Sequence, residues 1–191
     1  YTFLFHWTGS KAAEKIAAYF TDKDLRSKAE RLAARAAEKI EMCYRDDLHA
    51  YMQAIDNDNF DAATIHLVNM RYLDPSGDRA REHLSALAGH LKTEDGLFYR
   101  YLHEDDFGKP ETTFLVCAFW YAEALAVTGS VNEAISTIER LLGYSNHLGL
   151  FSEDAGADGS QWGNFPQTYS HVGLMNAIYR IAARLDSPVF L

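Results

Sequence analysis

Residues 112–127 read TTFLVCAFWYAEALAV, which is apolar at nearly every position. A helix that is apolar all round has to be buried on all sides. The chain then turns within residues 128–130, and the next segment starts with a capping-box pattern, Ser130 and Glu133. That segment carries an apolar stripe at the helical period, at Val131, Ile135, Ile138 and Leu142. A striped helix faces water on its polar side, so the two segments predict a buried inner helix followed by an outer helix.

The same alternation runs through the rest of the chain. Residues 1–7 and 62–70 are apolar nearly all round and predict further inner helices. Outer helices are predicted by two more stripes, Leu25, Ala29, Leu32, Ala36 and Ile40, and Leu84, Leu87, Ala88 and Leu91. No segment predicts a strand. We therefore expect an all-α chain of about seven helices, in the inner and outer alternation of an α/α toroid. A helical bundle or solenoid with uneven loops stays open, although no short-period repeat supports a solenoid.

The connections between these helices differ in length. The links from inner to outer helices are short, at residues 71–78 and 128–130. The links from outer to inner helices are long, at residues 44–60, 92–110 and 143–167. Each long link enters an inner helix at its N-terminus, so all three should gather on one rim. Long loops are disproportionately functional, and we expect a site on this rim.

Composition narrows the classes of function. The 191 residues are 48% hydrophobic and 24% charged, and they suffice for one domain with a sizeable core. The net charge of -9 disfavours nucleic acid or an anionic membrane as a partner. No apolar run is long enough for a membrane span and no secretory signal opens the chain, which indicates a cytoplasmic location. The first residue is Tyr1 rather than Met, so the true N-terminus is not fixed by this sequence.

Cofactor and metal chemistry find no support in the sequence. The chain has two cysteines, and Cys117 lies in an apolar run, which favours a buried free thiol over a disulfide. The eight histidines form no zinc-like pair with cysteine, and His-Glu-x-x-His is absent. Patterns for dinucleotide and phosphate binding are absent as well. We expect neither a metal nor a cofactor.

The two longest links are rich in groups that suit sugars. Residues 149–167 place the carboxylates of Glu153, Asp154 and Asp158 among the aromatic rings of Phe151, Trp162 and Phe165. The C–H face of a sugar stacks on an aromatic ring while its hydroxyls seek acceptors. Residues 96–111 combine Arg100, between Tyr99 and Tyr101, with Glu111. The alternative is a solvated acidic loop, with Glu111 as a favourable charge at the start of the apolar helix.

Several motifs carry a resemblance to a known family, in the right order. These are Gly-Leu-Phe-Tyr-Arg-Tyr at residues 96–101, Glu-Thr-Thr-Phe-Leu-Val-Cys-Ala-Phe-Trp at 111–120, Gly-Leu-Phe-Ser-Glu at 149–153 and Gly-Asn-Phe-Pro-Gln-Thr-Tyr-Ser-His-Val-Gly-Leu at 163–174. Residues 96–180 resemble the C-terminal part of the bacterial branch of family-15 glycoside hydrolases, which includes glucoamylases, glucodextranases and some trehalases. Residues 1–91 match more loosely. The resemblance covers most of the chain, but the chain corresponds to only about half of the family's catalytic domain.

The resemblance implies an (α/α)6 barrel and an inverting enzyme that releases glucose from non-reducing ends. Glu153 falls where the family places its general base. Arg100 and Glu111 fall on positions that hold the hydroxyls of the terminal glucose. Further residues are implied to line the pocket: Tyr101, Trp162, Asn164 and Gln167. Ser170 and His171 open the final helix, where a structural hydrogen-bonding role is at least as good an interpretation.

Two departures from the family pattern matter. Asp154 follows the base where the family more often has Gln or Glu. The general acid is absent, because nothing before Glu153 resembles its acidic, Trp-containing motif. We therefore expect residues 1–191 to be a single domain that forms the C-terminal half of a glucoamylase-like catalytic domain, inactive by itself. An open half-barrel would expose apolar faces of inner helices, so we expect self-association or pairing with the N-terminal half.

Three hypotheses about function remain. The first is a glycosidase that acts on α-glucosides such as maltooligosaccharides, starch-type glucans or trehalose. The second is a non-catalytic carbohydrate-binding or regulatory module with a glucoamylase-like shell. The third is another α/α toroid enzyme, such as a sugar epimerase or polysaccharide lyase. The retained Glu153, Arg100 and Glu111 favour the glycosidase, and the sequence does not choose among the linkages.

Overall fold

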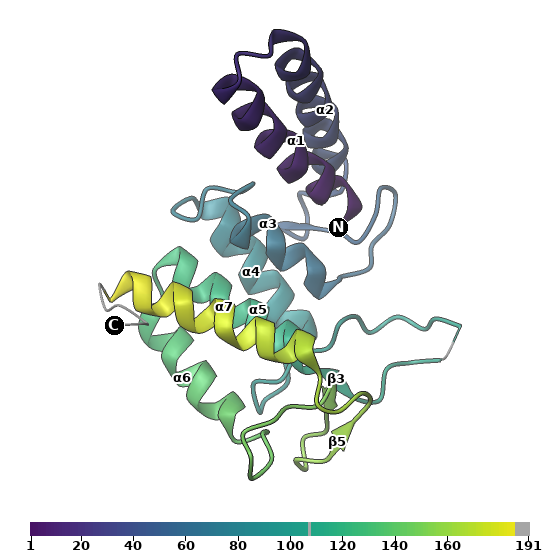
Figure 1. Cartoon of the computed structure of the whole chain (residues 1–191). Helices are drawn as coiled ribbons and strands as arrows, with labels where there is room; N and C mark the ends of the chain where they lie inside the picture. Colours follow the sequence, from purple (N-terminus) through teal and green to yellow (C-terminus); the bar gives the residue numbers. More distant parts are fainter. Residues whose placement is uncertain (107, 186–191) are drawn as a thin grey trace.

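The computed structural model describes residues 1–106 and 108–185. Over these residues the chain is mostly helical (Figure 1), as the sequence predicted. The α-helices are α1 (Thr2–Tyr19), α2 (Lys23–Glu41), α3 (His66–Asn69), α4 (Asp78–Leu91), α5 (Leu115–Thr128), α6 (Val131–Leu142) and α7 (Thr168–Arg184). A short 3-10 helix, η1 (Ala62–Ile65), leads into α3. Within these described ranges no helix is long and apolar enough to cross a membrane.

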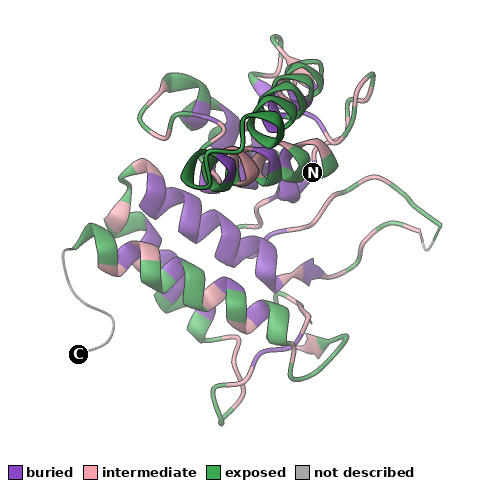
Figure 2. Ribbon diagram, turned by 45° about the horizontal axis from the view of Figure 1, so that its top comes forward, coloured by how far each residue is buried: buried purple, intermediate pink, exposed green. Residues whose placement is uncertain are grey.

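Helix α5 forms the centre of the molecule, as its apolar sequence predicted. Every residue from Leu115 to Val127 is buried, and α5 is the long, almost entirely purple helix of Figure 2. It packs against α3 and α7 and, across a turn at Gly129, against α6. Gly129 has a φ of 97°, a left-handed conformation that glycine adopts without steric cost. The free thiol of Cys117 is buried within α5, as expected from its position in the apolar run.

The N-terminal helix differs from its expected burial on all sides. Helices α1 and α2 lie side by side at one end of the molecule (Figure 1). Leu4 and Ala17 of α1 are buried, whereas Tyr1 is 46% and Phe5 44% exposed. The expectation was therefore wrong for α1, because α2 covers one of its sides and part of the apolar surface stays open.

The buried faces of α2 and α6 match the predicted stripes only in part, at Ala29, Ala36 and Ile40 of α2 and at Ile138 of α6. In α2 the buried residues are Ala29, Ala33, Ala36 and Ile40, while Leu25 and Leu32 are exposed. In α6 they are Ala134, Thr137, Ile138 and Leu141, with Leu142 exposed. Small side chains allow close approach of neighbouring helices, so alanine rather than leucine marks the contact of α2.

The capping box predicted at the start of α6 is not formed. Ser130 occupies the N-cap position, but its side chain makes no capping hydrogen bond. The tight turn after α5 explains this, because the Ser130 backbone N–H donates to the Leu125 carbonyl at 2.8 Å. Its backbone, with φ -79° and ψ 54°, lies outside the extended conformation typical of a capping residue.

The expectation of no strands was also wrong, since the described residues contain five strands of two residues each. Strands β1 (Tyr44–Arg45) and β2 (Ala50–Tyr51) pair in the first long link. Strands β3 (Thr113–Phe114), β4 (Asp154–Ala155) and β5 (Gln161–Trp162) form an antiparallel sheet in the order β3-β4-β5. These short pairs carry no periodic signal, but the three-stranded sheet joins the third long link to the residues directly before α5.

Backbone hydrogen bonds tie the long links together, in agreement with the predicted rim. The Ala62 N–H, at the end of the first link, donates to the Arg100 carbonyl in the second at 2.8 Å. The Leu115 N–H donates to the Glu153 carbonyl in the third link at 3.1 Å. The two later links lie together around β3 and β5 in Figure 1. The rim therefore holds Arg100 and Glu153 on one continuous framework.

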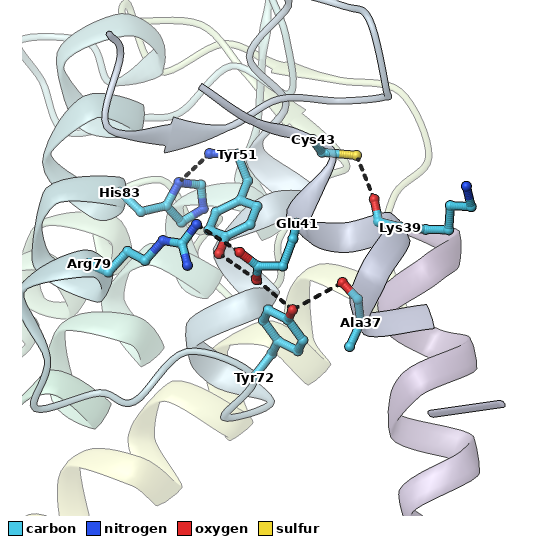
Figure 3. Close-up of polar contacts among 8 residues, drawn as sticks. All are labelled: Ala37, Lys39, Glu41, Cys43, Tyr51, Tyr72, Arg79 and His83. Carbon is cyan, nitrogen blue, oxygen red and sulfur yellow. Dashed lines mark hydrogen bonds and ion pairs between the residues drawn. The ribbon is translucent and has the colours of Figure 1, made fainter. Parts of the chain in front are cut away.

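A polar cluster fastens the α1–α2 pair to the rest of the molecule (Figure 3). The Glu41 carboxylate at the end of α2 accepts hydrogen bonds from the hydroxyls of Tyr51 (3.0 Å) and Tyr72 (2.6 Å). Its other oxygen lies 2.8 Å from the Arg79 guanidinium of α4. Nearby, the buried His83 ring accepts from the Tyr51 N–H at 3.3 Å and lies 3.1 Å from the Thr64 carbonyl. These contacts join α2 and α4 to β2 in the first long link.

Candidate active site

Glu153 is held at the entry to β4 by its backbone and its side chain. Its N–H donates to the Asn164 carbonyl at 2.9 Å, and its own carbonyl receives the Leu115 N–H. The Asn164 backbone N–H and side-chain Nδ2 both donate to Glu153 Oε2, at 3.0 and 2.8 Å. No hydrogen bond from the described residues reaches Oε1. One carboxylate oxygen is thus fixed by Asn164 while the other is available to a water or a ligand.

Gly163 makes this placement of Glu153 possible. Its φ is +74°, and a Cβ at this position would lie 2.8 Å from Glu153 Oε2 and 2.9 Å from Glu153 Cβ. Real Cβ atoms essentially never approach so closely, so any side chain here would push the carboxylate away. The Gly163-Asn164 pair therefore acts as a unit, in which Gly163 leaves the space and Asn164 supplies the hydrogen bonds.

Arg100 is oriented by an ion pair with Asp61. Its Nε and Nη2 donate to the two Asp61 carboxylate oxygens at 2.6 and 3.3 Å, a bidentate arrangement. Asp61 is buried and also accepts the Ala63 N–H at 2.7 Å, which caps η1. The guanidinium carbon lies 5.9 Å from the ring centroids of Tyr1 and Trp120. Sequence reasoning did not predict Asp61 as a site residue, because its partner Arg100 lies 39 residues away along the chain.

Arg100 and Glu153 line the same hollow, whose volume is about 500 Å³. Tyr101, Thr112, Phe114 and Asp154 also line it. The Thr112 hydroxyl donates to Asp154 Oδ2 at 2.6 Å. Burial raises the pKa of Asp154, the Thr112 hydrogen bond opposes this rise, and the charge of Glu153 adds to it. The hollow thus offers the guanidinium of Arg100, the adjacent carboxyl groups of Glu153 and Asp154 and the aromatic rings of Tyr101 and Phe114, a set that suits a polyhydroxylated ligand.

The other predicted site residues divide between a neighbouring hollow and structural positions. Glu111 and Trp162 line a second hollow, which shares Thr112 with the first. Asn164 contacts Glu153, as described above. Gln167 caps α7, where its side-chain oxygen accepts the Tyr169 N–H at 3.3 Å. The Tyr101 hydroxyl donates to Asp105, and its ring stacks on His103 at 4.4 Å.

The structure decides between the alternative interpretations of Glu111, Ser170 and His171. Glu111 does not start the apolar helix, which begins at Leu115 because Thr113 and Phe114 pair with β4 instead. The helix-dipole interpretation of Glu111 was therefore wrong. Ser170 is buried and donates to the Ser152 carbonyl at 2.8 Å, and His171 accepts the Phe151 N–H at 3.2 Å. In residues 1–106 and 108–185 no group of His, Cys, Asp and Glu side chains is arranged to hold a metal.

Comparisons of the sequence with known proteins point to one family. The sequence model described as "Glycosyl hydrolases family 15" matches residues 1–179. A trehalase of Mycobacterium tuberculosis is 37% identical over 140 residues, which are 71% of this chain and 20% of the relative. A trehalase of Thermoplasma volcanium is 31% identical over 150 residues, which are 78% of this chain and 23% of the relative. The chain therefore spans about a fifth of the length of these curated relatives.

Solved structures agree at the level of the fold. A bacterial glucoamylase complexed with acarbose matches with a TM-score of 0.77 at 13% identity, over 97% of this chain and 33% of that one. A structure titled "Glycosidase Wild Type" matches with a TM-score of 0.75 at 18% identity, over 94% of this chain and 50% of that one. The chain thus forms part of an (α/α)6 barrel, as the family resemblance implied and in agreement with the α/α toroid predicted from its alternating helices.

Proposed function

The chain belongs to glycosyl hydrolases family 15, and from this premise we propose that it supplies the general base and part of the sugar-binding site of an inverting α-glucosidase. The proposed enzyme removes glucose from the non-reducing end of an α-glucoside. Its candidate substrates are trehalose, maltooligosaccharides and starch-type glucans. The four curated relatives that match are named trehalase, which makes trehalose the first substrate to test.

The observation that carries the proposal is the environment of Glu153. A general base has to accept a proton from water as that water attacks the anomeric carbon. Asn164 holds Oε2 with two hydrogen bonds, so the direction of the carboxylate is set before any substrate arrives. The remaining oxygen, Oε1, can then accept the proton. Such preorganisation lowers the cost of orienting the reacting groups.

Arg100 has a complementary role in holding the sugar. Its bidentate contact with Asp61 uses Nε and Nη2, and the same side chain lines the hollow beside Glu153. Donor groups of the guanidinium that do not face Asp61 can bond the hydroxyls of the terminal glucose, each charge-assisted bond contributing about 1.5–3 kcal/mol. Phe114, in the same hollow, offers an apolar face to the ring.

The reaction also needs a general acid, which we place outside residues 1–191. In inverting glycosidases the two carboxyl groups stand about 6.5–9.5 Å apart, with the attacking water between the base and the sugar. Asp154 adjoins the base in the sequence and is engaged by Thr112, so we assign it no acid role. The chain alone is therefore proposed to be inactive, and the acid is supplied by the other half of the barrel.

The test is glucose release from trehalose, maltose, maltotriose and isomaltose. It compares residues 1–191, the full-length protein and the full-length protein with Glu153→Gln. We expect the full-length protein to cleave at least one sugar, and Glu153→Gln to lower kcat by roughly 10³-fold or more, since the variant keeps the shape but loses the base. A full-length protein that binds these sugars without cleaving them would replace this proposal with the carbohydrate-binding module.

A further inference from the structure

The first turn of α7 holds the two residues that directly precede Glu153. The Ser170 hydroxyl donates to the Ser152 carbonyl at 2.8 Å. The Phe151 N–H donates to His171 Nε2 at 3.2 Å, so the ring is neutral and carries its proton on Nδ1. Two neighbouring side chains of one helix thus grip two neighbouring backbone groups of the link that carries the proposed base.

The spacing of the residues on α7 explains how the helix reaches both positions. Gln167 is the N-cap of α7, and its backbone N–H donates to the Phe151 carbonyl at 2.8 Å. Ser170 and His171 follow it by three and four positions, which places all three residues on one face of the first turn. Both the N–H and the carbonyl of Phe151 are therefore bonded by α7.

These contacts are buried from water. Ser152 and Ser170 are 0% exposed and Phe151 is 1% exposed. The Phe151 ring packs edge-on against Phe119 of α5 and against the His171 ring, with both pairs of ring centroids 5.4 Å apart. A buried donor or acceptor that loses its partner is unfavourable, so residues 151 and 152 have to follow the position of α7.

The backbone passes this position on to Glu153. The Ser152 side chain reaches across Glu153, because its hydroxyl donates to the Asp154 carbonyl at 2.6 Å. The residue before Glu153 is thus tied both to α7 and to the residue after Glu153. Asn164 bonds the carboxylate itself, whereas α7 acts on the backbone from which that carboxylate extends.

We propose that Ser170 and His171 are positioning residues for the base, which hold residues 151 and 152 on α7 and so fix where Glu153 enters the site. The inference rests on the proposed glycosidase function. In the part of the chain that the structure describes, neither side chain lines the hollow of Arg100 and Glu153, so each acts through the backbone rather than on the sugar. A shift of the base changes the geometry of the attacking water, while Arg100 is still held by its own ion pair with Asp61. Loss of either contact therefore acts on kcat more than on KM.

The experiment uses the full-length protein and two substrates, the disaccharide that it cleaves fastest and α-glucosyl fluoride, whose leaving group needs little help from a general acid. His171→Leu removes the acceptor of the Phe151 N–H, and Ser170→Ala removes the donor to the Ser152 carbonyl. We expect each variant to lower kcat by roughly 10- to 100-fold on both substrates, with KM changed less than about threefold. His171→Gln carries an amide oxygen near the position of Nε2 and should keep kcat within about threefold of the wild type.

Thr128→Val is the matched control, because it removes a hydroxyl that donates to the Ala124 carbonyl at 2.9 Å, at the end of α5 opposite to Glu153. It should change neither kcat nor KM. Urea unfolding of each variant measures the folded fraction, and Ser170→Ala carries the test if His171→Leu does not fold.

The outcomes separate this inference from the function on which it rests. Unchanged kcat values, a loss confined to the disaccharide, or a loss in His171→Leu that His171→Gln does not restore would overturn the positioning role and leave the glycosidase proposal standing. A wild type that cleaves neither substrate would overturn both.

Discussion

The position of the Glu153 carboxylate, on which its proposed role depends, is set by two neighbours in space, Gly163 and Asn164. Asn164 donates two hydrogen bonds to one oxygen of the carboxylate, and Gly163 leaves the space in which that carboxylate lies. Both follow β5 in the chain, whereas Glu153 precedes β4. The hairpin between these strands is therefore the part that sets the position of the base. A change that moves this hairpin by a fraction of an ångström should act on kcat rather than on folding.

Gly163→Ala in the full-length protein tests this dependence. The substitution strains a backbone with φ +74° and forces a Cβ against Glu153, so we expect kcat to fall at least tenfold and stability to fall by about 1–2 kcal/mol. Gly149→Ala is the matched control, because Gly149 has the same φ of +74° but no heavy atom within 4 Å of an added Cβ. It should lose stability by about 1 kcal/mol and keep its kcat. Equal kcat values in the two variants would contradict a positioning role for Gly163.

His83 should make the stability of the protein depend on pH. Burial lowers the pKa of His83 from 6.5 to about 4, and the ring accepts the Tyr51 N–H through Nδ1 only while it is neutral. Between pH 4 and 6.5 the unfolded chain binds the proton more readily than the folded chain. Stability contributed by the neutral ring is therefore complete above pH 6.5 and falls by up to about 3 kcal/mol as the pH drops toward 4.

Urea unfolding at several pH values across this window measures the effect. His83→Asn keeps an acceptor for the Tyr51 N–H but cannot be protonated, so its stability should be lower than that of the wild type near neutral pH and should vary less between pH 6.5 and 4. An unchanged slope in the variant would show that other groups, such as His66, whose pKa is also lowered to about 4 by burial, control the acid limb.

Sequence reasoning proposed charged residues that the structure places in one hollow, but it missed two of the groups that position them. Glu153 and Arg100 were found through a resemblance that spans several motifs in order, and both line the first hollow. Asp61 and Gly163 were missed as site residues. An aspartate before a helix is typical of an ordinary cap, and the steric need for glycine appears only when Glu153 is seen beside it. Their roles arise from contacts between distant segments, which a sequence without its fold does not display.

At the scale of the helices, α2 and α6 both begin after a residue type that favours capping, but the two residues behave differently in the structure. Asp22 of α2 accepts the Leu25 N–H at 2.9 Å, whereas Ser130 of α6 makes no capping hydrogen bond. Asp22→Ala should therefore lower the free energy of unfolding by about 1 kcal/mol, and Ser130→Ala by less than about 0.5 kcal/mol. Urea unfolding of both variants measures the difference. A larger loss in Ser130→Ala would show that a capping hydrogen bond forms in solution.

The number of helices and the central position of α5 were predictable, because apolar residues recur at the helical period in several segments and the α5 segment is apolar at nearly every position. The faces of α2 and α6 were predictable only in part, because the predicted stripes included the exposed leucines Leu25, Leu32 and Leu142 and missed the buried Ala33 and Ala134. The strands were invisible, since two-residue pairs have no period. They matter nevertheless, because β3, β4 and β5 bring Thr112, Asp154 and Trp162 together from separate links.

At the scale of the whole molecule, no segment within residues 1–106 and 108–185 covers the face of α7 that points away from α5. Helix α7 packs on α5 through Ser170, Gly173, Ala177 and Ile181, which are buried. Gly173 fits against Phe119, because a Cβ there would lie 3.0 Å from Phe119 Cβ. The opposite face carries Val172, Met175 and Tyr179, which are 42%, 63% and 58% exposed. In a closed (α/α)6 barrel both sides of an inner helix are covered, so this face is where we expect the other barrel half to pack.

Residues 1–191 expressed alone should therefore self-associate. In sedimentation velocity we expect a concentration-dependent species heavier than the 21.5 kDa chain, because contact with a second copy buries the exposed apolar helix face and lowers the free energy.

Met175→Lys with Tyr179→Lys should shift the chain toward monomer. Leu148→Lys, which replaces a 69% exposed leucine in the loop after α6, should not. In the full-length protein we expect the other barrel half to cover this face, so the double variant should there lower stability instead, by about 2–4 kcal/mol for two charges placed in an apolar contact. A monodisperse monomer of residues 1–191 at micromolar concentration would contradict the open face and require that α7 be covered from within the chain.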